Sequence, residues 1–230
     1  MVDEVRFPGS AAAARALAQS VADDLRLGIE RRRVGSMVVS GGRQFIAFFK
    51  ALRKQELDWS RVWITLADER WVAAESEESN EHLLREHLLI GAVAAARFVP
   101  LRTSDVNPIS AVSEISERLQ AIPRPFDAVV LGMGADGHTA ALFPGMPALD
   151  AMLNPRWMLQ VATATAPTLP RERVTLTMRS LLDTQRIYLS LSGSTQQRVY
   201  AAARDGGSQY PVSAVLRQKF VPVSAMIAER

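Results

Sequence analysis

Short apolar runs alternate with helix-period segments along this chain, and this alternation constrains the fold more than any other feature. Strands are predicted at 36–40, 62–67, 97–101, 126–131, 157–162 and 186–192, and helices at 11–30, 44–55, 79–89, 108–122 and 196–204. Alternating strands and helices form a mostly parallel sheet with helices on both faces. We therefore expect a Rossmann-like α/β fold. The segment 163–170 is expected to be a loop and not a linker, so one large domain over residues 1–230 is predicted.

The composition excludes several classes of protein. The 230 residues include no cysteine, which excludes disulfides, iron–sulfur clusters and thiol catalysis. No apolar stretch reaches the roughly 18 residues of a membrane helix, and the N-terminal segment lacks the features of a signal peptide. We expect a cytoplasmic protein that does not bind membranes.

The basic residues are nearly all arginine. Of 27 Lys and Arg residues three are Lys, which leaves 24 Arg, and the formal net charge is only +3. The one basic run, at 31–33, follows a predicted helix, where positive charge stabilises the helix end. No interleaved basic and aromatic patch is present, so nucleic-acid binding is not expected.

Three glycine-containing loops follow predicted strands. They are Ser40-Gly41-Gly42, the loop 132–137, and Ser192-Gly193-Ser194-Thr195, and each is expected to precede a helical segment. The carboxyl ends of parallel strands share one edge of a sheet, so these loops should meet there. Glycine lets backbone N–H groups approach a ligand closely, and helix N-termini favour anions. The three loops together predict a site for a phosphorylated small molecule.

The loop 132–137 also matches the pattern G-x-G-x-x-G of dinucleotide-binding proteins. Pro144 and Gly145 interrupt any helix after it, and no strand ending in Asp or Glu follows at about 20 residues to bind a ribose. A nicotinamide cofactor is therefore not expected. No glycine loop carries the Gly-Lys-Ser or Gly-Lys-Thr of an ATP-binding P-loop.

His138 is the histidine that the sequence places in a ligand-facing loop. It follows Gly137 and is expected at the start of a short helix, where it serves either as a general base for water or only as a helix cap. His82 and His87 lie about 140° apart around a helix and do not form a metal-binding pair.

Charged residues are expected beside this loop. Asp68 and Arg70 end the strand 62–67 at the same edge, where they form either a surface ion pair or part of the site. A carboxylate there can orient His138, position water or take a proton from a sugar carbon, and Arg70 can bind phosphate through two N–H groups. Arg173, before the strand-like segment 174–177, is a second candidate anion ligand.

With these residues in view, the chain resembles the superfamily of glucosamine-6-phosphate isomerases and 6-phosphogluconolactonases. The resemblance covers almost the whole chain. It rests on Ser40-Gly41-Gly42, on Asp68-Glu69-Arg70-Trp71-Val72 followed by Ser79-Asn80, on the block 132–145 and on Arg173-Val-Thr-Leu-Thr177. Residues 139–144 resemble the lactonase branch more than the deaminase branch.

The resemblance implies hydrolysis of a 6-phosphogluconolactone, a small sugar phosphate, without a metal or an organic cofactor. We expect the protein to be a monomer. The resemblance also implies that His138 activates water while loop amides stabilise the oxyanion, and that Asp68 orients the site. The residues predicted for substrate binding are Ser40, Gly41, Gly42, Arg43, Arg70, Gly134, Asp136, Gly137, Arg173 and Gln196.

Two positions depart from the pattern of the superfamily. Arg43 stands where a serine is common, and Gln196 stands where a phosphate-binding lysine is common. We expect Arg43 to restore the charge that Gln196 lacks, because arginine binds phosphate as a planar fork. Two alternatives stay open: a sugar-phosphate deaminase or isomerase in which Asp68 removes a proton, and a non-catalytic phosphosugar-binding protein.

Overall fold

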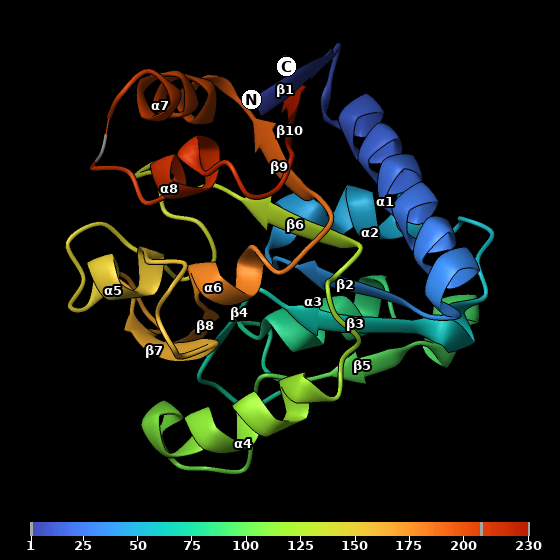
Figure 1. The fold of residues 1–230 in the computed structure, drawn as a ribbon, viewed down its shortest axis with the longest axis horizontal. Coiled ribbons are helices and arrows are strands. Elements are labelled where there is room, and N and C mark those ends of the chain that lie inside the picture. The colour runs from blue at the N-terminus through green and yellow to red at the C-terminus, as the bar shows by residue number, and fades with distance from the viewer. Residues whose placement is uncertain (1, 208, 230) are drawn as a thin grey trace.

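The computed structural model describes residues 2–207 and 209–229, and a seven-stranded sheet forms its centre (Figure 1). In spatial order the strands are β1 (Val2–Phe7), β10 (Val223–Ala228), β9 (Ile187–Ser192), β6 (Ala128–Gly132), β2 (Gly35–Val39), β3 (Val62–Leu66) and β5 (Arg97–Val99). Every neighbouring pair is parallel. All seven carboxyl ends therefore lie along one edge, which confirms the predicted parallel sheet.

Helices cover both faces of this sheet, as predicted. They are α1 (Ser10–Arg32), α2 (Ile46–Leu52), α3 (Asn80–His87), α4 (Pro108–Gln120), α5 (Leu149–Leu153), α6 (Met178–Leu181), α7 (Ser194–Arg204) and α8 (Val212–Arg217). In Figure 1, α1 and α2 lie on one side of the sheet, and α7 and α8 lie on the other. None of the helices in the described ranges is long and apolar enough to span a membrane.

The apolar stripes of the helices explain how they pack. In α1, Leu17, Val21 and Leu25 recur every four residues and are buried against the sheet. Phe45, just before α2, and Phe48 and Phe49 within it pack against one another, with ring centroids 5.5–6.4 Å apart. Arg32, in the basic run 31–33, ends α1 and pairs with buried Asp127, which agrees with a structural role for this run.

A second, smaller sheet is antiparallel and was not predicted. Its strands are β4 (Asp68–Arg70), β8 (Glu172–Leu176) and β7 (Val161–Thr165), in the order β4-β8-β7. The prediction that residues 68–70 end the main-sheet strand is therefore wrong. β3 stops at Leu66, and the following residues turn away to pair with β8. This turn leaves Asp68 and Arg70 near the edge of the main sheet but on a separate strand.

Two other predicted segments differ from the structure. The strand expected at 157–162 lies at Val161–Thr165, and it takes three residues of the segment expected to be a loop, because β7 pairs with β8 across a hairpin. No helix starts at His138. Thr139 and Leu142 form a bridge, Ala140 has a positive φ of 47°, and the next described helix begins at Leu149.

Candidate active site

A cavity of about 260 Å³ opens at the edge of the sheet where the carboxyl ends of the strands meet. It is lined by Ser40, Gly41, Gly42, Gln44, Phe45, Asp68, Arg70, Asn80, Gly132, Met133, Gly134, His138, Ala140 and Gln196. The structure thus brings together eight of the twelve residues predicted for the site. Arg43, Asp136, Gly137 and Arg173 are the other four and do not line the cavity.

His138 is held in place by Asp136 from its own loop. The imidazole Nδ1 lies 2.6 Å from Asp136 Oδ1, and the same oxygen accepts the His138 backbone N–H at 3.1 Å. Partial burial raises the pKa of Asp136, but the hydrogen bond and charge of His138 outweigh it and hold that pKa below its usual value. The carboxylate engages Nδ1, so Nε2 is the imidazole nitrogen left for a ligand in the cavity.

The glycines of this loop are required by its shape. A Cβ on Gly134 would lie 2.2 Å from the His138 ring, closer than any real contact. Gly137 has a φ of 79°, and its Cβ would collide with Tyr210. The N–H groups of Gly134 and Gly137 donate to the carbonyls of His138 and Gly134. These two amides are therefore engaged within the loop and are not free to stabilise an oxyanion.

Asp68 faces the cavity from β4 and is half-buried. Burial raises the pKa of this carboxyl, although the charges of Arg173, Arg70 and His138 oppose the shift. The Asp68 backbone carbonyl accepts a hydrogen bond of 2.9 Å from the Asn80 side chain. Asp68, Arg70 and His138 therefore act on one another electrostatically across a small space.

Glu69 joins β4 to the start of α3. Its carboxylate is buried and accepts the backbone N–H groups of Arg70, Asn80 and Glu81 at 2.6–2.8 Å, and the Ser79 hydroxyl at 3.1 Å. These bonds hold Arg70 and Asn80 at the cavity wall. Glu69 and Asn80 were not predicted as site residues, although an acidic residue between two predicted site residues is a signal in the sequence.

Arg173 lies behind the cavity on β8, opposite Arg70 in the strand register. It is buried, and burial together with the charge of Arg70 lowers the pKa of its guanidinium. Its Nη1 atom has no hydrogen-bond partner within the described ranges. Arg173 therefore adds positive charge behind Asp68 and does not reach the cavity surface.

Arg43 does not take the place expected for it. Its side chain is exposed and lines a second hollow, together with Lys50 of α2, outside the cavity of His138. This placement gives no support to the predicted compensation for Gln196. Gln196 does line the cavity, together with Gln44, which was not predicted as a site residue. Across residues 2–207 and 209–229, no three His, Asp or Glu side chains are grouped as a metal site.

The sequence was also compared with protein families and with known proteins. Residues 8–223 match the model of the family described as glucosamine-6-phosphate isomerases/6-phosphogluconolactonase. A 6-phosphogluconolactonase of Rhizobium meliloti strain 1021 is 40% identical over 219 residues, covering 94% of each chain. One from Pseudomonas aeruginosa PAO1 is 40% identical over 212 residues, covering 91% of this chain and 89% of that protein.

Solved structures share the fold as well. The crystal structure of a 6-phosphogluconolactonase from Shewanella baltica OS155 matches with a TM-score of 0.95 and 36% identity, covering 99% of this chain and 98% of that one. A monomeric glucosamine-6-phosphate deaminase has the same fold at 14% identity, with a TM-score of 0.79, covering 99% of this chain and 98% of that one. These matches confirm the resemblance that the motifs predicted. The chain belongs to the family of glucosamine-6-phosphate isomerases and 6-phosphogluconolactonases.

Proposed function

We propose that this protein hydrolyses 6-phospho-D-glucono-1,5-lactone to 6-phospho-D-gluconate, a step of the oxidative pentose phosphate pathway. The observation that carries the proposal is the contact of His138 with Asp136 beside a small polar cavity. The relatives that are 40% identical over nine-tenths of the chain are named for this activity, which supports the same reaction here.

In the proposed reaction, His138 Nε2 removes a proton from a water molecule, whose oxygen attacks the lactone carbonyl carbon. The tetrahedral intermediate then collapses and breaks the bond between that carbon and the ring oxygen. Protonated His138 returns its proton to the leaving ring oxygen, which becomes a hydroxyl. Asp136 keeps the ring oriented and stabilises the imidazolium while it exists.

Positive and polar groups around the cavity would hold the negative charge of the substrate. Arg70 is the one guanidinium among the described lining residues, and its Nη1 donates 2.7 Å to the Glu78 carbonyl, which leaves its other N–H groups for a phosphate. Ser40, Gly41 and Gly42 line the cavity beside it. Asp68 would orient these groups, and no step requires a metal or an organic cofactor.

We propose that the enzyme acts as a monomer on a small sugar phosphate in the cytoplasm.

The test is the production of 6-phosphogluconate from freshly generated lactone. Glucose 6-phosphate and a dehydrogenase supply the lactone, and formation of the product is followed with and without the protein, because the lactone also hydrolyses spontaneously. Acceleration above the spontaneous rate is expected. A folded protein that leaves this rate unchanged, or that instead releases ammonia from glucosamine 6-phosphate, would contradict the proposal.

A further inference from the structure

The side-chain amide of Gln196 is fully engaged by the protein. Its Oε1 accepts the Ser192 backbone N–H at 2.7 Å, while its Nε2 donates to the Met133 carbonyl and, at 3.3 Å, to Gln44 Oε1. A primary amide has two N–H donors, so none is left for a ligand. Gln196 therefore ties together three loops of the cavity but has no donor for a phosphate oxygen.

The partners of Gln196 determine how its amide is oriented. A backbone N–H must face an oxygen and a backbone carbonyl must face an N–H group, so Ser192 and Met133 allow one orientation. The Nε2 atom of Gln196 then faces Gln44. Because Nε2 is a donor, the Gln44 atom that faces it must be the acceptor Oε1. The Nε2 of Gln44 is consequently turned away from Gln196. It lies so close to Gly132 that a Cβ there would be 2.4 Å from it.

The surroundings of Gln44 indicate a ligand with hydrogen-bonding oxygens. Ser40 is 5% exposed and lines the same cavity, yet its hydroxyl has no partner among the described residues. Gln196 lies in the first turn of α7, an eleven-residue helix with no acidic residue in that turn. An unpaired buried hydroxyl and an uncompensated helix N-terminus both favour an anion at this end of the cavity.

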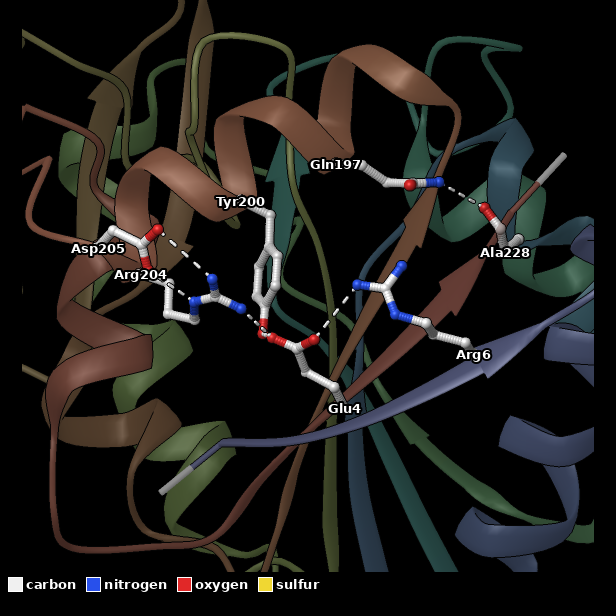
Figure 2. Close-up of polar contacts among 7 residues, drawn as sticks. All are labelled: Glu4, Arg6, Gln197, Tyr200, Arg204, Asp205 and Ala228. Carbon is white, nitrogen blue, oxygen red and sulfur yellow. Dashed lines mark hydrogen bonds and ion pairs between the residues drawn. The ribbon is translucent and has the colours of Figure 1, made fainter.

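α7 is anchored firmly on its other side, which keeps Gln196 in register. Figure 2 shows Gln197 donating to the Ala228 carbonyl, and Tyr200 and Arg204 both bonded to Glu4 of β1. The distances are 2.8, 2.9 and 2.6 Å. The position of the Gln196 backbone therefore does not depend on its own side-chain contacts.

We propose that Gln44 donates through Nε2 to the phosphate of the substrate, and that Gln196 is a positioning residue that turns the Gln44 amide toward it. The inference rests on the proposed function, since the phosphate is that of the lactone. It reverses the expectation from the sequence, in which Gln196 contacted the substrate and Gln44 had no role.

The test is a cycle of three variants: Gln44→Met, Gln196→Met and the double substitution. Methionine keeps the length of the side chain without donors or charge. The dissociation constant of 6-phosphogluconate is measured by calorimetry, with inorganic phosphate as a second probe. Gln44→Met should weaken binding about tenfold, the effect of one hydrogen bond to a charged group, and should raise KM with little change in kcat.

Gln196→Met alone should weaken binding less than Gln44→Met, and adding it to Gln44→Met should weaken binding no further. Additive losses would show that Gln196 contacts the ligand independently and would overturn the proposal, as would wild-type binding by Gln44→Met. Gln120→Met is the matched control, an exposed glutamine at the end of α4 and outside the cavity, and it should bind like the wild type.

The two proposals fail in different ways. If the wild type binds phosphate with the expected pattern among the variants but does not hydrolyse the lactone, the proposed function fails and the roles of Gln44 and Gln196 stand. If the lactone is hydrolysed and Gln44→Met binds as the wild type does, only the present inference fails.

Discussion

At the scale of single residues, Gly134 is the position where one methyl group should remove activity without unfolding the chain. The Cβ of Gly134→Ala would lie 2.2 Å from the His138 ring, and the partly exposed ring can move away. We expect kcat to fall about 100-fold, the usual contribution of a positioned base. Thermal unfolding should shift by only a few degrees. A variant with normal kcat would show that the position of His138 is unimportant.

Asp136→Asn tests whether the charge beside His138 matters as well as the hydrogen bond. Because the pKa of Asp136 lies below its usual value, the carboxylate is ionised throughout the neutral range. An amide keeps a contact with the ring but cannot balance an imidazolium. We expect kcat to fall about 100-fold with KM nearly unchanged, as measured by steady-state kinetics. An unchanged kcat would contradict the proposed role of this carboxylate.

At the scale of elements, the contact between β1 and α7 should make stability depend on pH. Burial raises the pKa of Glu4, but the hydrogen bonds from Tyr200 and Arg204 outweigh it and leave the pKa lowered (Figure 2). A lowered pKa in the folded state means that the stabilisation is complete above the ordinary value of 4.5 and is lost as pH falls through the lowered value.

Glu4→Gln should therefore lower the free energy of unfolding by about 1 kcal/mol at neutral pH, since the pair is partly exposed. The difference from the wild type should vanish in acid, as followed by urea denaturation from pH 7 to about 3. Asp3→Asn, at the exposed neighbouring position, is the control and should have no such dependence. A difference that persists at low pH would mean that the Glu4 charge is not the cause.

Helices and strands with a regular local pattern of apolar residues were predictable from the sequence. Strands that form only by pairing with a distant segment were not. α1 and β6 follow from local patterns of apolar residues, because each buries a regular stripe or run. β4 did not follow, since Asp68-Glu69-Arg70 has no strand pattern and becomes extended only by pairing with β8. β1 was missed because it is an edge strand without a buried run and is extended only by pairing with β10. β10 was missed although its six residues are all buried. The same limit applies to Gln44, whose role depends on a residue 152 positions away.

At the scale of the whole molecule, the cavity is built from loops after β2, β6 and β9 of the main sheet and from β4 of the small sheet, so a ligand there contacts segments that lie far apart in the chain. Binding to the folded state alone should stabilise the protein as a unit, by about 2.7 kcal/mol at 100 times the dissociation constant. We expect 6-phosphogluconate to raise the unfolding temperature by about 5–10 °C. Gluconate, which lacks the phosphate, should have a much smaller effect, and equal shifts would argue against phosphate recognition.

The glycine loops of the site could be placed at one sheet edge from sequence because their strands are parallel, and this placed His138, Ser40 and Gly41 correctly in one cavity. Asp68 lines the same cavity, but from a strand of the second sheet that the sequence did not predict. Side-chain directions could not be predicted in the same way. Arg43 is near the site in the chain, yet its side chain lines another hollow. Arg173 is near the site in the small sheet, yet its side chain is buried behind the cavity wall. The predicted monomer stays a prediction that light scattering can check.

The most direct test of the account is the rate of lactone hydrolysis by His138→Ala beside the wild type, at saturating lactone and with the spontaneous rate subtracted. His138 lies at the cavity and is held by Asp136, so its loss should reduce the catalysed rate by at least about 100-fold while the protein stays folded. A folded His138→Ala variant that hydrolyses the lactone at the wild-type rate would contradict the central claim that this imidazole activates the water.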